Sequence, residues 1–276
     1  MKHFRFPILF TLLLITLLGG CNTPELPSLP DLPIEAPDFS NLPAIPEALR
    51  NLPGVLEDLG LPDLSQIANL PTLEDLPSFQ SAPGTITYNG PTERRVNIGE
   101  RIPGTDIVLT SINDSSAEFQ IASLRSQRTS GDSLDFDGAW PGVGGSTYTL
   151  RLRLYYIGSD HVRAAGVHQL VLSNIQPVAD NSQPGGLTLK FPFTVNASVG
   201  EIIAGTTYSY AGMDDRGGQI NGLPQGDYPY RKVGDSIVWA GHIRPDLVAA
   251  YNLRMLYYNA DQAQVGGIVT LALPGQ

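Results

Sequence analysis

The stretch YTLRLRLYY (residues 148–156) alternates apolar and polar side chains at every second residue. Its three leucines, Leu150, Leu152 and Leu154, point to one side of an extended chain, and the side chains between them point to the other. A period of two is typical of a β-strand with one buried face. No long 3.6-residue pattern occurs after Pro83, so the sequence predicts an all-β fold for this part of the chain.

This part of the chain repeats itself at a spacing of about 100 residues. Residues 83–114, PGTITYNGPTERRVNIGERIPGTDIVLTSIND, align without a gap on residues 184–215, PGGLTLKFPFTVNASVGEIIAGTTYSYAGMDD, with ten identities in 32 positions. The segment GDSLDFDG (131–138) matches GDSIVWAG (234–241) at an offset of 103. A duplicated unit of this length has the size of a small domain rather than of a solenoid repeat.

Within each copy, short apolar runs are separated by Gly, Pro, Asn and Asp, which predicts six or seven strands. We therefore expect two tandem Ig-like β-sandwich modules, residues 83–183 and residues 184–276, without the cystine and core tryptophan of antibody domains. A single larger barrel built from both halves is the main alternative. YNLRMLYY in the second copy is one residue shorter than its counterpart, which predicts a bulge or shifted register near Arg254.

The N-terminus has the pattern of a secretory signal peptide. Lys2 and Arg5 precede thirteen mostly apolar residues, Phe6 to Leu18. A spanning helix needs about 20 such residues, so export and cleavage are expected rather than a permanent span. Residues 1–20 are assigned to the signal peptide.

Leu18-Gly19-Gly20-Cys21 resembles the lipobox of bacterial lipoproteins, and Cys21 is the one cysteine of the chain. The resemblance implies cleavage before Cys21, a diacylglyceryl group on its thiol and acylation, commonly with palmitate, of its new amine. Several acyl chains anchor a protein firmly to a membrane, whereas one chain binds only marginally. In Gram-negative members Asp after the cysteine favours the inner membrane, so Asn22 favours the outer membrane if the organism has one. The alternative is an ordinary signal peptide with an incidental cysteine.

The segment from Cys21 to residue 82 is rich in proline, leucine and acidic residues. Residues 22–82 contain eleven prolines, ten acidic residues and one basic residue, so the segment carries −9 of the net charge of −10. Eight Leu-Pro pairs favour extended backbone, which predicts a semi-extended tether. Its many leucines are unusual for a linker, and the alternative is a segment that docks on a partner or lies along an apolar groove.

Few residues have the spacing of a catalytic, cofactor or metal site. The acidic composition argues against nucleic-acid binding, and no hydrolase, zinc-protease or phosphate-loop motif occurs, so no enzyme activity and no cofactor is predicted. Asp132, Asp135 and Asp137 are weak candidates for a Ca²⁺ site, although their spacing differs from that of an EF-hand. Asp135 with Asp137 is also the one faint lead for an acid pair. The histidines His161, His168 and His242 show no ligand spacing.

The aromatic residues are the better candidates for binding. The candidates are Trp140, Tyr155, Tyr156, Tyr257 and Tyr258. In each tyrosine pair, strand alternation is expected to bury one ring and expose the other, and exposed tyrosines favour recognition of proteins or sugars. The alternative is that these rings complete a small core.

These features together predict a non-enzymatic lipoprotein, anchored in the cell envelope through an N-terminal lipid. Its two modules are expected to bind another envelope protein or a surface polymer. The alternatives are an envelope polysaccharide hydrolase and a small-ligand carrier with an apolar cavity.

Overall fold

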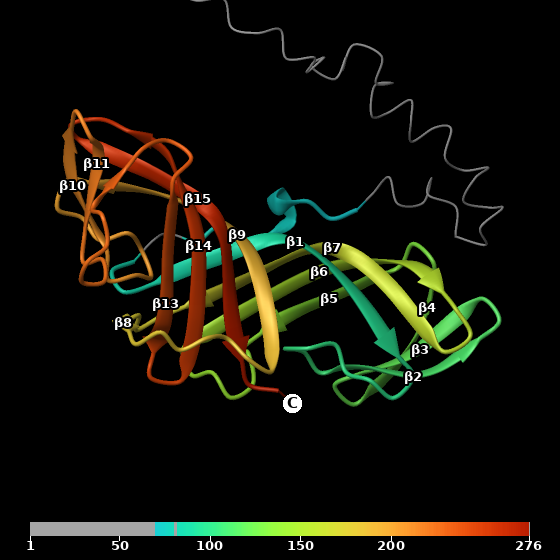
Figure 1. Ribbon diagram of the computed structural model, residues 1–276. Coiled ribbons are helices and arrows are strands. Elements are labelled where there is room, and N and C mark those ends of the chain that lie inside the picture. The colour runs from blue at the N-terminus through green and yellow to red at the C-terminus, as the bar shows by residue number, and fades with distance from the viewer. Residues whose placement is uncertain (1–69, 80–81, 276) are drawn as a thin grey trace, which may run out of the picture. The chain divides into compact units, whose positions relative to one another are not determined.

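The computed structural model describes residues 70–79 and 82–275, and these residues form an all-β protein, as predicted (Figure 1). Copy 1 contains β1 (Ile86–Asn97), β2 (Ile107–Asn113), β3 (Ser116–Ile121), β4 (Leu124–Thr129), β5 (Ser133–Gly138), β6 (Ser146–Ile157) and β7 (His161–Leu172). Copy 2 contains β9 (Leu187–Ser198), β10 (Ser209–Asp214), β11 (Gly217–Asn221), β12 (Tyr230–Arg231), β13 (Ser236–Arg244), β14 (Leu247–Tyr258) and β15 (Gln262–Leu273). A 3-10 turn, η3 (Leu73–Asp75), precedes copy 1, and β8 (Val178–Ala179) lies between the copies.

The two copies have the same topology. In copy 1 the strands form a long sheet with the order β1-β7-β6-β5 and a small sheet with the order β2-β3-β4. In copy 2 the long sheet is β8-β13-β14-β15-β9 and the small sheet is β10-β11-β12. Every pairing is antiparallel, and the registers agree, because Ile86 pairs with Leu172 as Leu187 pairs with Leu273. Each strand of copy 1 therefore has a counterpart in copy 2, as the sequence repeat predicts.

The strand order differs from that of an immunoglobulin constant domain. Those domains place strands A, B, E and D in one sheet and C, F and G in the other. Here the first strand joins the last three, and the second, third and fourth form the other sheet. Each copy is thus a two-layer β-module with a different connectivity.

Within residues 70–79 and 82–275, no helix is long and apolar enough to cross a bilayer.

The alternation in β6 has the predicted effect on burial. Leu150, Leu152 and Leu154 are buried, whereas Arg151 and Arg153 on the opposite face are partly exposed. Because the long strands have twelve residues, this apolar face is longer than the small sheet that packs on it. A second covering surface is therefore needed along the rest of each long sheet.

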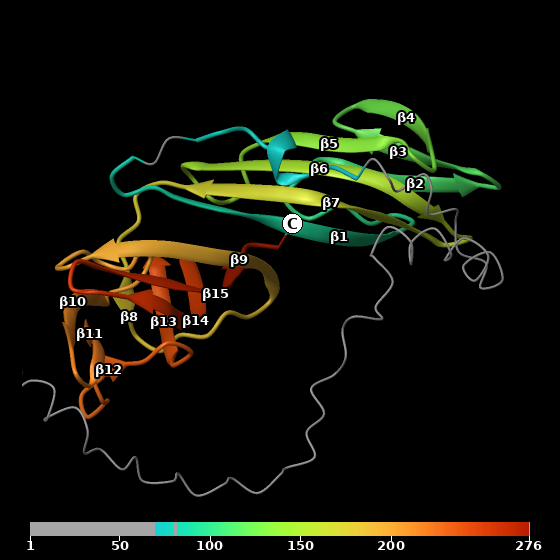
Figure 2. The ribbon, with the colours of Figure 1, turned by 90° about the horizontal axis from the view of Figure 1, so that it is seen from above.

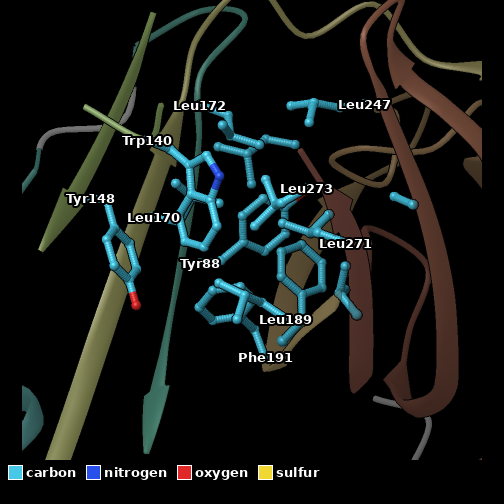
Figure 3. Packing of buried hydrophobic residues seen from close by; sticks show 14 of the residues in the cluster. Tyr88, Trp140, Tyr148, Leu170, Leu172, Leu189, Phe191, Leu247, Leu271 and Leu273 are labelled. Carbon is cyan, nitrogen blue, oxygen red and sulfur yellow. The ribbon is translucent and has the colours of Figure 1, made fainter. Parts of the chain in front are cut away.

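The long sheet of the other copy supplies that second surface. The ring of Tyr88 in β1 lies 5.6 Å from that of Phe191 in β9, and its hydroxyl lies 2.5 Å from the hydroxyl of Tyr251 in β14. Figure 3 shows Leu170 and Leu172 of copy 1 facing Leu189, Leu271 and Leu273 of copy 2, and these side chains belong to one buried cluster that spans both copies. The two tandem copies therefore share one core instead of forming two separate ones.

Both copies have a β-bulge at the same place. The pairing of β6 with β7 skips Tyr155, and the pairing of β14 with β15 skips Leu256. The bulge in copy 2 was expected near Arg254 and lies two residues further on. Since the bulges coincide, Tyr156 corresponds to Tyr257, so the two tyrosine pairs are offset by one residue in the fold.

Each copy also has a buried turn that fixes the start of its small sheet. In copy 1 the Thr105 hydroxyl donates a hydrogen bond to the Ile102 carbonyl and accepts one from the Ile107 amide. Gly104 in this turn has a φ of +82°, and a Cβ there would lie 2.3 Å from Cζ3 of Trp140. Gly99, just before the turn, has a φ of +85° with no atom within 4 Å of its Cβ position.

Replacing Gly104 with Ala is expected to destabilise the protein more than replacing Gly99 with Ala. Both variants pay about 1–2 kcal/mol for a left-handed backbone conformation. Only Gly104→Ala also collides with Trp140, and overpacking adds about 1–3 kcal/mol. Urea unfolding of the two variants measures the difference. Equal losses would mean that the turn is not packed against Trp140.

The contact between the copies contains a buried histidine. The ring of His168 in β7 stacks on Phe191 of copy 2 at 4.4 Å and 18°, and its Nδ1 lies 3.4 Å from the Tyr148 hydroxyl. Burial, assisted by the charge of Arg94, lowers the pKa of His168 from 6.5 to about 3. The ring is therefore neutral in the folded chain at neutral pH.

His168 is expected to make stability depend on pH. Between about pH 6.5 and pH 3 the unfolded chain binds a proton at this residue and the folded chain does not, so the free energy of unfolding falls as the pH falls. The limiting slope is about 1.4 kcal/mol per pH unit. The counterpart of His168 in copy 2 is Val269, so His168→Val is a natural control that removes this contribution. Urea unfolding at pH 7 and pH 4.5 checks this, and the same pH dependence in both proteins would contradict it.

Candidate functional site

Trp140 is not an exposed binding residue, contrary to the prediction. It is 1% exposed, its ring packs edge-on against Tyr148 with centroids 4.9 Å apart, and its Nε1 donates a hydrogen bond to the Pro274 carbonyl at 3.3 Å. The loop between β5 and β6 folds over the contact between the copies and places the indole there (Figure 3). The tryptophan is part of the shared core.

Tyr155 belongs to a network across three strands of the copy 1 long sheet. Its hydroxyl donates a hydrogen bond to Glu93 at 2.6 Å, and Arg163 donates to the same carboxylate oxygen at 2.8 Å. The hydrogen bond from Tyr155, together with Arg163, lowers the pKa of Glu93, and partial burial beside that carboxylate raises the pKa of Tyr155. These groups satisfy one another, which favours a role in holding β1, β6 and β7 together.

The other predicted tyrosines differ between the copies. Tyr257 is 49% exposed and Tyr258 is half-buried, so the rings of copy 2 differ in exposure although neither is fully buried. Tyr155 and Tyr156 are both half-buried, because the bulge at Tyr155 interrupts the alternation. The prediction of one buried and one exposed ring is therefore wrong for copy 1.

The three aspartates have separate roles. Asp132 accepts a hydrogen bond from the Thr129 amide at 2.7 Å and closes the turn before β5. Asp137 forms two hydrogen bonds of 2.9 Å with Nη2 of Arg151, and Asp135 is exposed on the same face. Nowhere in the described part of the chain do three His, Cys, Asp or Glu side chains gather as metal ligands. Cys21 lies outside the described residues.

Two of the histidines form pairs with carboxylates. His161 Nδ1 lies 2.6 Å from the neighbouring Asp160, and its ring packs on Tyr156 at 5.3 Å. His242 Nδ1 lies 2.6 Å from Asp180, which belongs to the segment between the copies. The second contact joins the segment between the copies to β13.

A recess at the small sheet of copy 2 combines exposed aromatic and charged groups. Its volume is about 610 Å³, and it lies between β12, the turn before β13 and the turn between β10 and β11. It is lined by Asp215, Arg216, Tyr228, Tyr230, Arg231, Lys232, Asp235 and Ser236. The sequence analysis did not identify this site, although the sequence contains both of its tyrosines.

Arginines hold the two tyrosines of the recess in place. The Arg216 guanidinium lies over the Tyr230 ring at 3.8 Å from its centroid and also bonds the Tyr230 hydroxyl. Arg231 donates hydrogen bonds to the Tyr228 carbonyl and, at 2.9 Å, to the Ser236 carbonyl. The Tyr228 and Tyr230 rings lie 5.6 Å apart at 54°. Tyr230 is buried, whereas Tyr228 is 60% exposed and presents its ring to solvent.

Arg216 also forms an ion pair with a carboxylate beside the recess. Its guanidinium pairs with Asp214 at 2.5 Å, and this hydrogen bond is the main cause that lowers the pKa of Asp214 from 3.8 to about 2. The ion pair therefore persists above about pH 3. Arg216 is both the support of Tyr230 and the partner of Asp214, so the wall of the recess is one connected unit.

Copy 1 lacks an equivalent recess wall because its residues differ at the matching positions. The pairing of β3 with β4 and of β11 with β12 matches Tyr230 with Gln127 and, two residues earlier, Tyr228 with Arg125. The strand β4 has six residues, whereas β12 has two. The signal available in the sequence was this replacement of polar side chains by two tyrosines in only one copy.

No protein-family model, curated protein or solved structure matches the chain. The candidate site therefore rests on its own geometry. That geometry is a polar recess with one exposed tyrosine ring and several fixed donors and acceptors.

Replacing Arg216 with Gln is expected to return the pKa of Asp214 from about 2 toward 3.8, because the main hydrogen-bond donor is lost. A pH titration of the Asp214 carboxyl carbon by NMR measures this shift. Arg231→Gln is the matched control, since Arg231 contacts carbonyl oxygens rather than Asp214. An unchanged Asp214 titration in Arg216→Gln would contradict the ion pair.

Proposed function

We propose that this protein is a non-enzymatic, lipid-anchored lipoprotein of the cell envelope that binds a sugar polymer through the recess of copy 2. The observation that carries the proposal is the exposed ring of Tyr228 beside charged and hydroxyl side chains. A tyrosine ring offers an apolar face to the carbon face of a sugar and a polar edge to its hydroxyls. Ligand pockets for apolar molecules are lined mainly by hydrophobic residues, which this recess lacks.

The fixed groups around Tyr228 support a ligand that is rich in hydroxyls. Lys232 is exposed at the rim, Asp235 lies on the turn before β13, and Ser236 is the first residue of β13. The lining thus contains both donors and acceptors, which suits hydroxyl groups that both donate and accept. The mixed charges of the lining do not favour a strongly anionic polymer over a neutral one.

The lipid anchor rests on the resemblance of Leu18-Gly19-Gly20-Cys21 to a lipobox. Acylation at Cys21 would hold the chain at the membrane, in the outer membrane where one exists, and the proline-rich segment would hold the two copies away from it. The end of that segment also packs on copy 1, since Leu76 is buried there.

Sugar binding is tested with the full-length chain and Tyr228→Ala. Fluorescent glycan strands prepared from the cell wall and oligosaccharides of the cell surface serve as probes. Loss of the stacking ring is expected to weaken binding about tenfold, equivalent to about 1.4 kcal/mol. Tyr257→Ala is the matched control, because Tyr257 is similarly exposed but does not line the recess. Equal affinities for the wild type and Tyr228→Ala, or no affinity of the wild type for any glycan, would contradict the proposal.

Lipid anchoring is tested by metabolic labelling with an alkyne analogue of palmitate. The wild-type chain is expected to carry label and to sediment with membranes. Cys21→Ser is expected to lose both properties, because the resemblance assigns the acylated thiol to this residue alone. A labelled Cys21→Ser chain, or an unlabelled wild type, would overturn the lipoprotein assignment.

A further inference from the structure

The last described part of the proline-rich segment packs on the outer face of the copy 1 long sheet (Figures 1 and 2). Leu76 is 8% exposed, and the Gln169 side chain in β7 donates a hydrogen bond to the Pro77 carbonyl at 3.2 Å. Val167 and Val171, on the same face of β7, are buried as well. The Thr72 amide donates to Asp75 at 2.7 Å and shapes η3. Residues 73–76, Leu-Glu-Asp-Leu, are thus a docked motif that is held through Leu76, since Leu73 is 52% exposed.

The equivalent face of copy 2 exposes two large apolar side chains, with the polar Asn252 between them. The register matches Val167 with Ile268, which is 46% exposed, and matches Asp135 with Val238, which is 59% exposed. These two side chains line a hollow of about 550 Å³ with Lys190 at its edge. This face is therefore partly covered by Leu76 and Pro77 in copy 1, whereas Val238 and Ile268 are exposed in copy 2.

The proline-rich segment contains a second copy of the docked motif. Leu-Glu-Asp-Leu occurs at residues 73–76 and again at residues 56–59, and a Leu-Pro pair precedes each, at residues 70–71 and 52–53. The eleven residues from Leu59 to Leu70 reach about 34 Å when extended, at about 3.1 Å per residue. Packed sheets lie about 10 Å apart, so this length allows a path around one edge of the two layers.

We propose that residues 55–62 of the same chain dock on the outer face of the copy 2 long sheet, over Val238 and Ile268. Leu59, which has the place in its motif that Leu76 has in the docked one, would cover these side chains, as Leu76 is buried on the outer face of copy 1. Lys190 replaces Asn89 of copy 1 and lies where the acidic Glu57 and Asp58 would pass, so the charges are complementary. The proline-rich segment would then contact the outer faces of both long sheets. This inference does not depend on the sugar recess, which lies on a different sheet.

The test places a photoreactive benzoylphenylalanine at Val238 of the full-length chain and maps the crosslinked peptides by mass spectrometry. The expected product is an intramolecular crosslink to residues 55–62 in the monomer fraction. Leu59→Asp in the same chain is expected to lower the yield at least about tenfold, because a charge replaces the buried leucine. Leu26→Asp, another leucine of a Leu-Pro pair, is the matched control and is expected to leave the yield unchanged.

Three outcomes would overturn the proposal. The first is the absence of crosslinks between Val238 and residues 55–62. The second is a crosslink that forms only between two molecules, which heavy-isotope mixing of labelled and unlabelled chains reveals. The third is an equal loss in Leu59→Asp and Leu26→Asp, which would mean that any leucine of the segment contacts this face nonspecifically.

Discussion

Each long sheet buries its apolar face against two different surfaces, and the rest of the structure depends on this division. One part of the face is covered by the small sheet of the same copy, and another part by the long sheet of the other copy. At the contact between the copies, the hydroxyls of Tyr88 and Tyr251 bond each other in a buried setting where water cannot replace either partner. Burial raises the pKa of both groups, so neither ionises in the normal pH range. A single copy would leave this part of its sheet exposed to water.

The sequence alone supports the fold class and the repeat because both depend on local periodicity. Alternation at Leu150, Leu152 and Leu154 identifies the buried face of β6, and the aligned glycines identify the second copy. The shared core could not be inferred this way, since periodicity shows that a face is buried but not what covers it. The run VHQLVL (167–172) has apolar residues on both faces of β7, and this was the available signal for a second covering layer, now seen to include Leu76.

The candidate site was predicted less well than the fold, and Trp140, Tyr155 and Tyr228 show why. Trp140 stands in a glycine-rich loop, where a large side chain is expected on the surface, but that loop closes over the contact between the copies. Tyr155 was expected to alternate with its neighbour, and a bulge changes its direction. The recess at Tyr228 exists because copy 2 differs from copy 1 there, so comparison of the two copies with each other carries more functional information than either copy alone.

The central claim is that the two copies fold as one cooperative unit, and native-state hydrogen exchange of Leu170→Ala in the full chain tests it most directly. Leu170 lies in copy 1 at the contact between the copies, and truncation of a buried leucine costs about 2–5 kcal/mol. The account predicts that the slowest amides of β6 in copy 1 and of β14 in copy 2 lose the same opening free energy. A loss confined to β6, with β14 exchanging as in the wild type, would show that the copies unfold independently and would contradict the account.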